Sequence, residues 1–335
     1  MISFINQNFL NREYNVMLIK MCLVFKIVFL TVLCLFSMSQ GSGQDCYGAE
    51  PVPTIETEHL FDLDADFMYP CDVTVNPDGQ IYVVDGISNS VKIFDKNGKY
   101  RTSFGSEGSG EGRFLNPLGI TCDVSGQIYV ADAGNHRVQI FDADGRFLRK
   151  LRLTAGDKER IPDPADVAVD ETRDLLYVID NDNHKIRVYS KKTLQLLDQW
   201  GQRGEKPGEF QFPFLAATDK KGTLYVVDVL NTRVQVLNSE GRTMALVGKW
   251  GVDRGQMYRP KGVAIDAQDR IYVSDGYLGR IQVFNRNKKF QGVVGDTSGF
   301  MAKFKTPTGI YVDGNMRLYV VEMLAHKVSV YKIKQ

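Results

Sequence analysis

An internal repeat constrains the fold of this chain more than any other sequence feature. A strand-like segment ending in an acidic residue, such as IYVVD at Asp85 and IYVAD at Asp132, recurs every 47 or 48 residues, and a proline lies about 15 residues before each acid. A fixed period of this length indicates a ring or stack of similar structural units. The repeat prolines are Pro70, Pro117, Pro164, Pro213, Pro260 and Pro307.

Each copy contains four short apolar runs separated by turn residues. In the first copy, Val73–Val75 is followed by the turn Asn76–Gly79, the strand ending at the acid, a third run from Val91 and a weaker fourth run ending near Gly105. Short β-branched and aromatic runs between Gly and Asn turns are typical of antiparallel strands. Four strands at this period predict one blade of a β-propeller.

The ends of the repeat array predict how the ring closes. The last copy stops after its third strand, at residues 328–333, and residues 55–63 ahead of the first copy can supply the missing strand. This pairing would remove an exposed sheet edge. The sequence therefore predicts an all-β fold, a closed six-bladed β-propeller of four-stranded antiparallel blades over residues 55–335, preceded by a lead-in segment at 40–54.

The repeats resemble the NHL-repeat family. The second copy carries PLGI from Pro117, YVAD from Tyr129 and NHRV from Asn135, and the same pattern recurs in all six copies. The resemblance implies a six-bladed propeller. It implies no single activity, because the family and its relatives include ligand-binding scaffolds, RNA-binding modules and enzymes.

The first 39 residues have the pattern of a secretory signal. Lys20 and Lys26 precede the apolar run 27–38, which small and polar residues follow. The run is about 12 residues long, whereas a membrane span needs roughly 20. We therefore expect export to a secreted or periplasmic location, with cleavage near Ser39 to Gly41, translation starting at Met1, Met17 or Met21, and no permanent membrane span.

Three cysteines remain after the expected cleavage: Cys46, Cys71 and Cys122. An odd number excludes a closed disulfide framework and leaves open whether one pair forms. The formal net charge of the whole chain is +1. A protein that binds nucleic acid through its phosphates usually has a basic excess, so no nucleic-acid partner is expected.

The repeated acids and the residues five positions later predict structural ion pairs. Acid and base flank a four-residue hairpin loop, so they should face each other across two strands. We expect exposed pairs that each contribute about 0–1 kcal/mol. Ser90 takes the place of the base in the first copy. The predicted pairs are Asp132 with Arg137, Asp180 with Lys185, Asp228 with Arg233, Asp275 with Arg280 and Glu322 with Lys327.

An enzymatic alternative comes from a second resemblance. Peptide-amidating lyases are similar propellers and share a YVSDGY stretch like residues 272–277. Their zinc histidines enter near the start of innermost strands, where this chain has none, so neither a metal nor another cofactor is expected. A metal-dependent lyase or lactonase-like enzyme would instead use carboxylates near the channel mouth, Asp72, Asp163 and Asp166, which could hold calcium.

The variable positions between copies indicate a binding surface. Residues just before the prolines share one face with the loops between second and third strands, and we call this the linker-side face. The tight turns such as NPDG and DADG lie on the opposite, turn-side face. We predict a non-enzymatic scaffold that binds a protein or peptide through the linker-side face, and leave its oligomeric state open. The predicted rim is Tyr69, Asn116, Asp163, Phe212, Arg259 and Thr306, supplemented by Cys71, Phe214 and Lys261.

Overall fold

The computed structural model describes residues 52–156 and 159–334. These residues fall within the compact unit Val52–Gln335. The predicted signal segment, its possible starts at Met17 and Met21, Cys46 and most of the lead-in segment lie outside the described residues. Within the described ranges, no helix is long and apolar enough to cross a membrane.

The described residues form short strands and two single-turn 3-10 helices, Ala133–Asn135 and Met323–Ala325. The first half of the strands comprises β1 Thr54–Leu63, β2 Pro70–Val75, β3 Ile81–Asp85, β4 Ser90–Phe94, β5 Tyr100–Phe104, β6 Pro117–Cys122, β7 Ile128–Asp132, β8 Arg137–Phe141, β9 Phe147–Arg152, β10 Pro164–Asp170, β11 Leu175–Asp180 and β12 Lys185–Ser190. The second half comprises β13 Leu196–Trp200, β14 Pro213–Thr218, β15 Leu224–Asp228, β16 Arg233–Leu237, β17 Thr243–Val247, β18 Pro260–Ile265, β19 Ile271–Asp275, β20 Arg280–Phe284, β21 Phe290–Gly295, β22 Pro307–Val312, β23 Arg317–Glu322 and β24 Lys327–Ile333.

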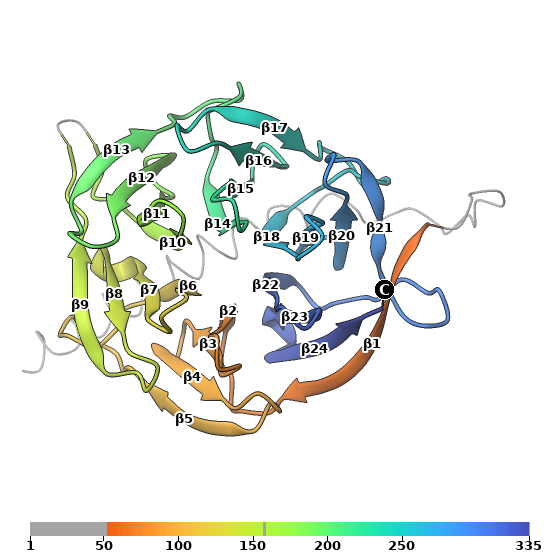
Figure 1. The fold of residues 1–335 in the computed structure, drawn as a ribbon, viewed down its shortest axis with the longest axis horizontal. Helices are drawn as coiled ribbons and strands as arrows, with labels where there is room; N and C mark the ends of the chain where they lie inside the picture. The colour runs from red at the N-terminus through yellow and green to blue at the C-terminus, as the bar shows by residue number, and fades with distance from the viewer. Residues whose placement is uncertain (1–51, 157–158, 335) are drawn as a thin grey trace, which may run out of the picture. The chain divides into compact units, whose positions relative to one another are not determined.

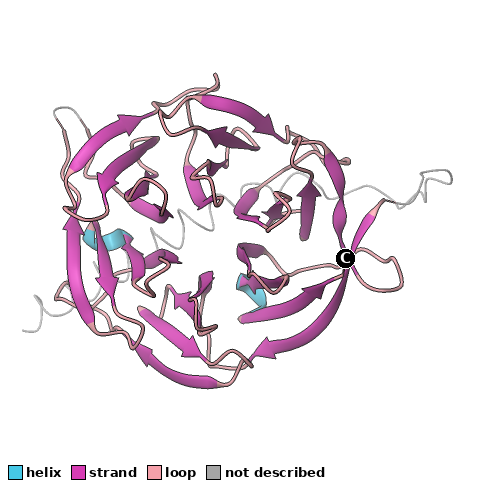
Figure 2. Ribbon diagram, in the orientation of Figure 1, coloured by secondary structure: helices cyan, strands magenta, loops and turns pink. Residues whose placement is uncertain are grey.

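Four consecutive groups of strands form separate four-stranded sheets, β2–β5, β6–β9, β10–β13 and β14–β17. Every pairing within them is antiparallel. Figure 1 shows the sheets arranged around a common axis, with β2, β6, β10, β14, β18 and β22 innermost. Almost all of the regular structure is strand (Figure 2). The prediction of an all-β propeller built from four-stranded antiparallel blades is therefore confirmed.

The other eight strands form one sheet in the order β18-β19-β20-β21-β1-β24-β23-β22. β1 pairs antiparallel with β24, from Thr57 opposite Ile333 to Leu63 opposite Val328. At its other end β1 pairs parallel with β21, from Thr54 to Glu56. The buried hydroxyl of Thr57 also donates to the carbonyl oxygen of Gly295, at 2.9 Å. The sequence pattern did not predict this parallel pairing.

A tyrosine on the second strand of each repeat anchors the turn-side face. Tyr129 and Tyr272 are fully buried, and their hydroxyls donate to Asp123 and Asp266 at 3.0 and 3.1 Å. The other carboxylate oxygen of Asp123 accepts the backbone N–H groups of Ser125 and Gln127 and so fixes the turn. The buried tyrosine ring is thus hydrogen-bonded to the polar turn between the first and second strands. This bond holds the turn-side end of the inner strand in place.

Candidate functional site

The repeated acids position the linker-side face. Each acidic side chain accepts backbone N–H groups from residues just before the repeat proline: Asp132 accepts from Leu115 at 2.8 Å, and Asp275 accepts from Tyr258 and Arg259 at 2.7 and 3.1 Å. Backbone N–H groups are the partners that a buried carboxylate needs. The acids therefore tie the linkers to the hairpin loops, a role that the repeat pattern did not predict.

The structure forms three of the five predicted ion pairs, and the two that lie in the second and fourth repeats are buried. The distance from Arg137 Nε to Asp132 Oδ2 is 2.7 Å, and that from Arg233 Nε to Asp228 Oδ2 is 2.9 Å. The expectation that these pairs are exposed is wrong, because Asp132 and Asp228 are 0% exposed and Arg233 only 8%. The linker lies over each pair and excludes water from it.

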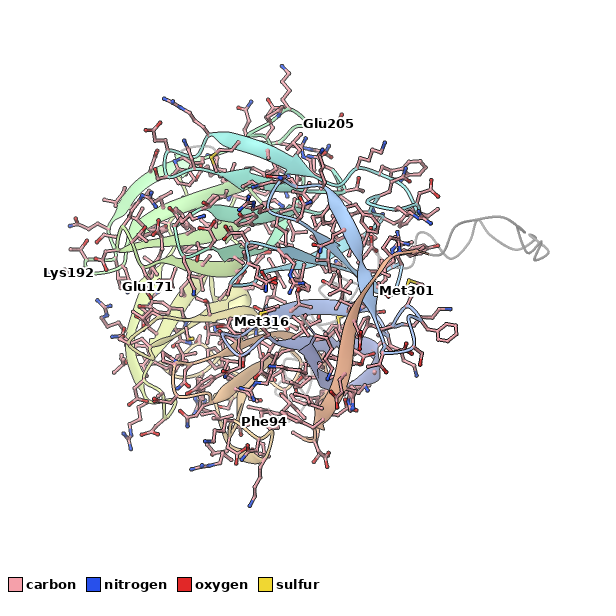
Figure 3. All side chains as sticks on the ribbon, turned by 45° about the vertical axis from the view of Figure 1, so that its right-hand side comes forward. Phe94, Glu171, Lys192, Glu205, Met301 and Met316 are labelled. Carbon is pink, nitrogen blue, oxygen red and sulfur yellow. The ribbon has the colours of Figure 1, made fainter. Side chains whose placement is uncertain are left out.

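Each of these arginines also binds the linker itself. Arg233 donates to the carbonyl oxygens of Glu205, Lys206 and Glu209 at 2.7–3.0 Å. Glu205 is labelled in Figure 3. Arg137 makes the equivalent bonds to the carbonyls of residues 109, 110 and 113. One guanidinium thus joins an acid on one strand to the neighbouring linker through several charge-assisted hydrogen bonds.

The remaining predicted pairs differ from one another. Lys327 Nζ lies 3.4 Å from Glu322. Asp180 pairs with the buried Arg187 at 2.7 Å, while Lys185 pairs with Glu159. Asp180 and Lys185 lie opposite each other in the strand register, as predicted. The predicted ion pair between them is wrong, because the longer guanidinium two residues further along β12 reaches the acid.

Arg280 lies opposite Asp275 in the strand register. Its Nη2 donates to the carbonyl oxygens of Val252 and Asp253, both at 2.9 Å, and its buried Nε has no hydrogen-bond partner. In the first repeat, Ser90 lies opposite Asp85, and Lys92 supplies the cation at 3.2 Å.

The predicted rim residues are all half-buried and lie just before the inner strands. Asn116, Phe212 and Thr306 have left-handed backbones, with φ of 50, 56 and 53°. The backbone N–H of Phe212 donates to His184 Nδ1 at 3.1 Å, and the two rings meet edge to face. Tyr69, Asp163, Arg259 and Thr306 accept a bond through their carbonyl oxygens from the adjacent hairpin loop.

A contact across repeats is made by two of the supplementary residues. Lys261 Nζ on β18 lies 5.1 Å from the centre of the Phe214 ring on β14.

Cys71 is buried, and burial raises the pKa of its thiol to about 12. It is therefore an unreactive thiol at neutral pH.

A cavity of about 710 Å³ lies on the axis. It is lined by the turn-side part of the inner strands, away from the linker-side face. Its walls come from the turn-side ends of the inner strands and the turns that follow, and include Thr74, Thr121 and Tyr311. Glu171 and Met316, which follow β10 and β22, mark this side in Figure 3. None of the six predicted rim residues lines the cavity, and sequence reasoning did not predict it.

Two buried carboxyl groups lie at the cavity wall. Asp72 Oδ2 accepts the backbone N–H of Ile120 at 3.0 Å, and Asp166 Oδ2 accepts that of Ala216 at 2.8 Å. Burial raises the pKa of both groups, and the charge of Asp72 raises the pKa of Asp166 further. The Asp166 carboxyl packs against Gly119, where any larger side chain would collide with it.

The calcium site that the sequence suggested does not fit these residues. Calcium takes six to eight oxygen ligands, whereas Asp72 and Asp166 each face a backbone N–H donor, and Asp163 does not line the cavity. Within the described ranges, no group of three or more His, Cys, Asp or Glu side chains could hold a metal ion. The three carboxyl groups therefore do not converge on one site.

The raised pKa values predict a pH-dependent gain in stability for Asp166→Asn. The amide oxygen of asparagine can still accept the Ala216 N–H bond, and no charge has to be buried. Because the folded chain holds the carboxyl proton more tightly than the unfolded chain, wild-type stability falls as pH rises above about 4. We expect the variant to be more stable than wild type by about 1–3 kcal/mol at pH 8 and nearly equal at pH 4. Urea unfolding at both pH values measures this, and an equal difference at both would contradict it.

Comparisons with known proteins agree with the fold. A family described as "6-bladed beta-propeller" matches residues 72–155, and the NHL repeat matches residues 162–189 and 257–284. No curated protein sequence matches the chain.

Three solved structures share the architecture at low sequence identity. A structural-genomics protein from Bacteroides thetaiotaomicron is 18% identical, with 84% of this chain and 73% of that chain covered and a TM-score of 0.61. A streptogramin B lyase is 14% identical, with 83% and 97% covered and a TM-score of 0.58. A catalytically inactive virginiamycin B lyase from Staphylococcus aureus with quinupristin is 15% identical, with 79% and 80% covered and a TM-score of 0.57. At these identities the likeness concerns the fold alone. The matched NHL repeats agree with the repeat pattern of the sequence, and in these segments the chain resembles the NHL-repeat β-propellers.

Proposed function

We propose that this chain is an exported, non-enzymatic NHL-repeat propeller that binds a protein or peptide through its linker-side face. The distribution of exposed apolar side chains carries the proposal. Among the described residues, the turn-side face exposes one large apolar side chain, Val124, whereas the segments of the linker-side face expose eight. Apolar side chains exposed mainly on one face favour a partner-binding surface there. They are Met68, Ile87, Ile161, Trp250, Val252, Tyr277, Phe300 and Leu324.

The proposal includes a ring of six blades, with β1 as the fourth strand of the last one. The antiparallel pairing of β1 with β24 supports this role, and the short parallel pairing with β21 joins the last two blades into one sheet. Export rests on the signal pattern of residues 1–39. A rigid ring with a fixed binding face suits an exported scaffold, since little ordering is needed on binding.

Affinity capture is the first experiment. The immobilised chain is exposed to the secreted or periplasmic fraction of its source, and the retained proteins are identified by mass spectrometry. A specific partner competed by soluble chain is the expected result. The enzymatic alternative predicts instead an activity on small lactones or peptide substrates that chelation abolishes.

Arg259→Ala and Phe212→Ala are expected to weaken binding of the captured partner by about 1–3 kcal/mol with little change in melting temperature. Arginine and aromatic side chains most often dominate partner interfaces, because they bury much surface at modest entropic cost. Asp144→Ala, an exposed change on the turn-side face, is the control and should not alter binding. Titration calorimetry measures all three variants, and equal losses from both faces would contradict the proposal.

A further inference from the structure

Two cations near the start of β18 form no ion pair with any described residue, in contrast to the arginines of three other repeats. Arg137, Arg187 and Arg233 each form an ion pair with a repeat acid. Within the described residues, neither Arg259 nor Lys261 forms an ion pair with an acid. Arg259 Nε is buried without a hydrogen-bond partner, although one Nη is 3.4 Å from the Tyr258 carbonyl oxygen. Buried donors without a partner are costly, so an acceptor from beyond the described residues would stabilise this site.

The nearest repeat acid cannot fill this place. The carboxylate oxygens of Asp275 accept the backbone N–H groups of Tyr258, Arg259, Tyr277 and Leu278 at 2.7–3.2 Å. The carboxylate oxygens of Asp275 are therefore occupied by N–H donors from the linker and the hairpin loop.

Aromatic rings surround the two cations. The Arg259 guanidinium lies 5.4 Å from the centre of the Tyr258 ring, and that ring packs against Tyr277 with centroids 4.3 Å apart. Lys261 reaches across to the Phe214 ring of the neighbouring repeat and is only 8% exposed. A guanidinium binds a carboxylate through two parallel bonds, and the rings offer apolar surface to the carbon skeleton that carries it.

We propose that Arg259 and Lys261 form a binding site for an organic carboxylate at the linker-side mouth. The carboxylate can come from a free small acid or from a peptide, as a C-terminus or an acidic side chain. The peptide source rests on the proposed function, whereas the small-acid source stands without it. The aromatic surroundings favour an organic acid over inorganic phosphate, whose oxygens need polar contacts on every side.

Charge at the site adds a pH signature. Burial, with a smaller contribution from the charge of Arg259, lowers the pKa of Lys261 to about 8, and Asp275 opposes this shift. Phe214 on β14 and Thr306 before β22, which pack near the lysine, bring no charge. Because the carboxylate needs the protonated amine, affinity should fall as pH rises from about 7 to 9.

The test uses 3-phenylpropionate, its neutral amide and inorganic phosphate as probes of the full chain by titration calorimetry. We expect the carboxylate to bind at least about tenfold more tightly than the amide and than phosphate. Lys261→Met keeps an apolar stem and removes the charge. This variant should lose about tenfold in affinity and show no pH dependence between 7 and 9, while Lys249→Met, an exposed lysine in the preceding linker, should behave like wild type.

The outcomes separate this inference from the proposed function. Equal binding of acid and amide, tighter binding of phosphate, or full affinity in folded Lys261→Met, with folding checked by circular dichroism, would overturn the carboxylate site. Affinity capture of a partner could still succeed in that case. An acetylated tetrapeptide with a free or an amidated C-terminus distinguishes the sources: dependence on the free terminus supports a peptide carboxylate, and binding of 3-phenylpropionate alone supports a small acid.

Discussion

Arg233→Ala is expected to lower the free energy of unfolding by about 3–5 kcal/mol, the typical cost of removing one partner from a buried ion pair. Asp228 would keep its charge at 0% exposure but lose the cation 2.9 Å away. The carbonyl oxygen of Glu205 would lose its donor in the same step, whereas those of Lys206 and Glu209 would keep the bonds from the Glu209 N–H and from Gln235 Nε2. The linker should therefore loosen along with the loss of global stability.

Urea unfolding of wild type and variant measures the change, and hydrogen exchange over residues 201–212 reports on the linker. Lys221→Ala is a matched control, because its partner Asp269 lies 3.1 Å away but the two side chains are 73% and 40% exposed. Exposed pairs contribute little, so the control should change stability by less than about 1 kcal/mol. Equal losses in the two variants would contradict the assignment of Arg233 as a buried clamp.

The sequence predicted the strand register of the Asp228–Arg233 pair but not its burial. The repeat spacing placed Asp228 opposite Arg233, because strand register follows from hairpin length. Burial does not follow from hairpin length. It depends on the linker at residues 201–212 folding back over the pair, and this linker ends 16 residues before Asp228.

Side-chain reach limited the prediction in the third repeat. Lys185 stands at the expected position, yet Asp180 binds Arg187 at 2.7 Å. Both cations lie on β12, and their spacing of two residues puts them on the same side of the strand. Only the surrounding packing, including Glu159 from the preceding linker, decides which cation turns toward which acid.

The sequence predicted which residues lie at the rim of the linker-side face, but it did not predict the axial cavity. The proline positions identified the residues just before the inner strands, including Arg259 and Phe212. The axial cavity was not predicted because it needs the inner strands of separate repeats to be placed around one axis. A usable signal was present at the third inner-strand position, where Gly119 and Gly309 allow the carboxyl groups of Asp166 and Asp72 to pack closely.

Removal of β1 is expected to have the largest effect of any change considered. A chain that begins at Asp66 should melt at least about 10 °C lower than one that begins at Val52 and should self-associate. The deletion takes away the antiparallel partner of β24 and the parallel partner of β21. It also removes the buried side chains of Ile55 and Leu63, each of which contributes about 1.5–3 kcal/mol through burial.

The edge exposed by this deletion provides a stricter test than the melting temperature. Residues 328–333 of β24 would present unpaired backbone groups, which another strand can occupy. A synthetic peptide of residues 54–65 should therefore raise the melting temperature of the truncated chain and return it to a monomer, as measured by calorimetry and analytical ultracentrifugation. The same peptide with proline in place of His59 and Phe61 should fail, because proline has no backbone N–H to donate to the ladder. A truncated chain as stable and monomeric as the longer one would rule out closure by β1. Rescue by the proline peptide would show that apolar burial, rather than strand pairing, accounts for the effect.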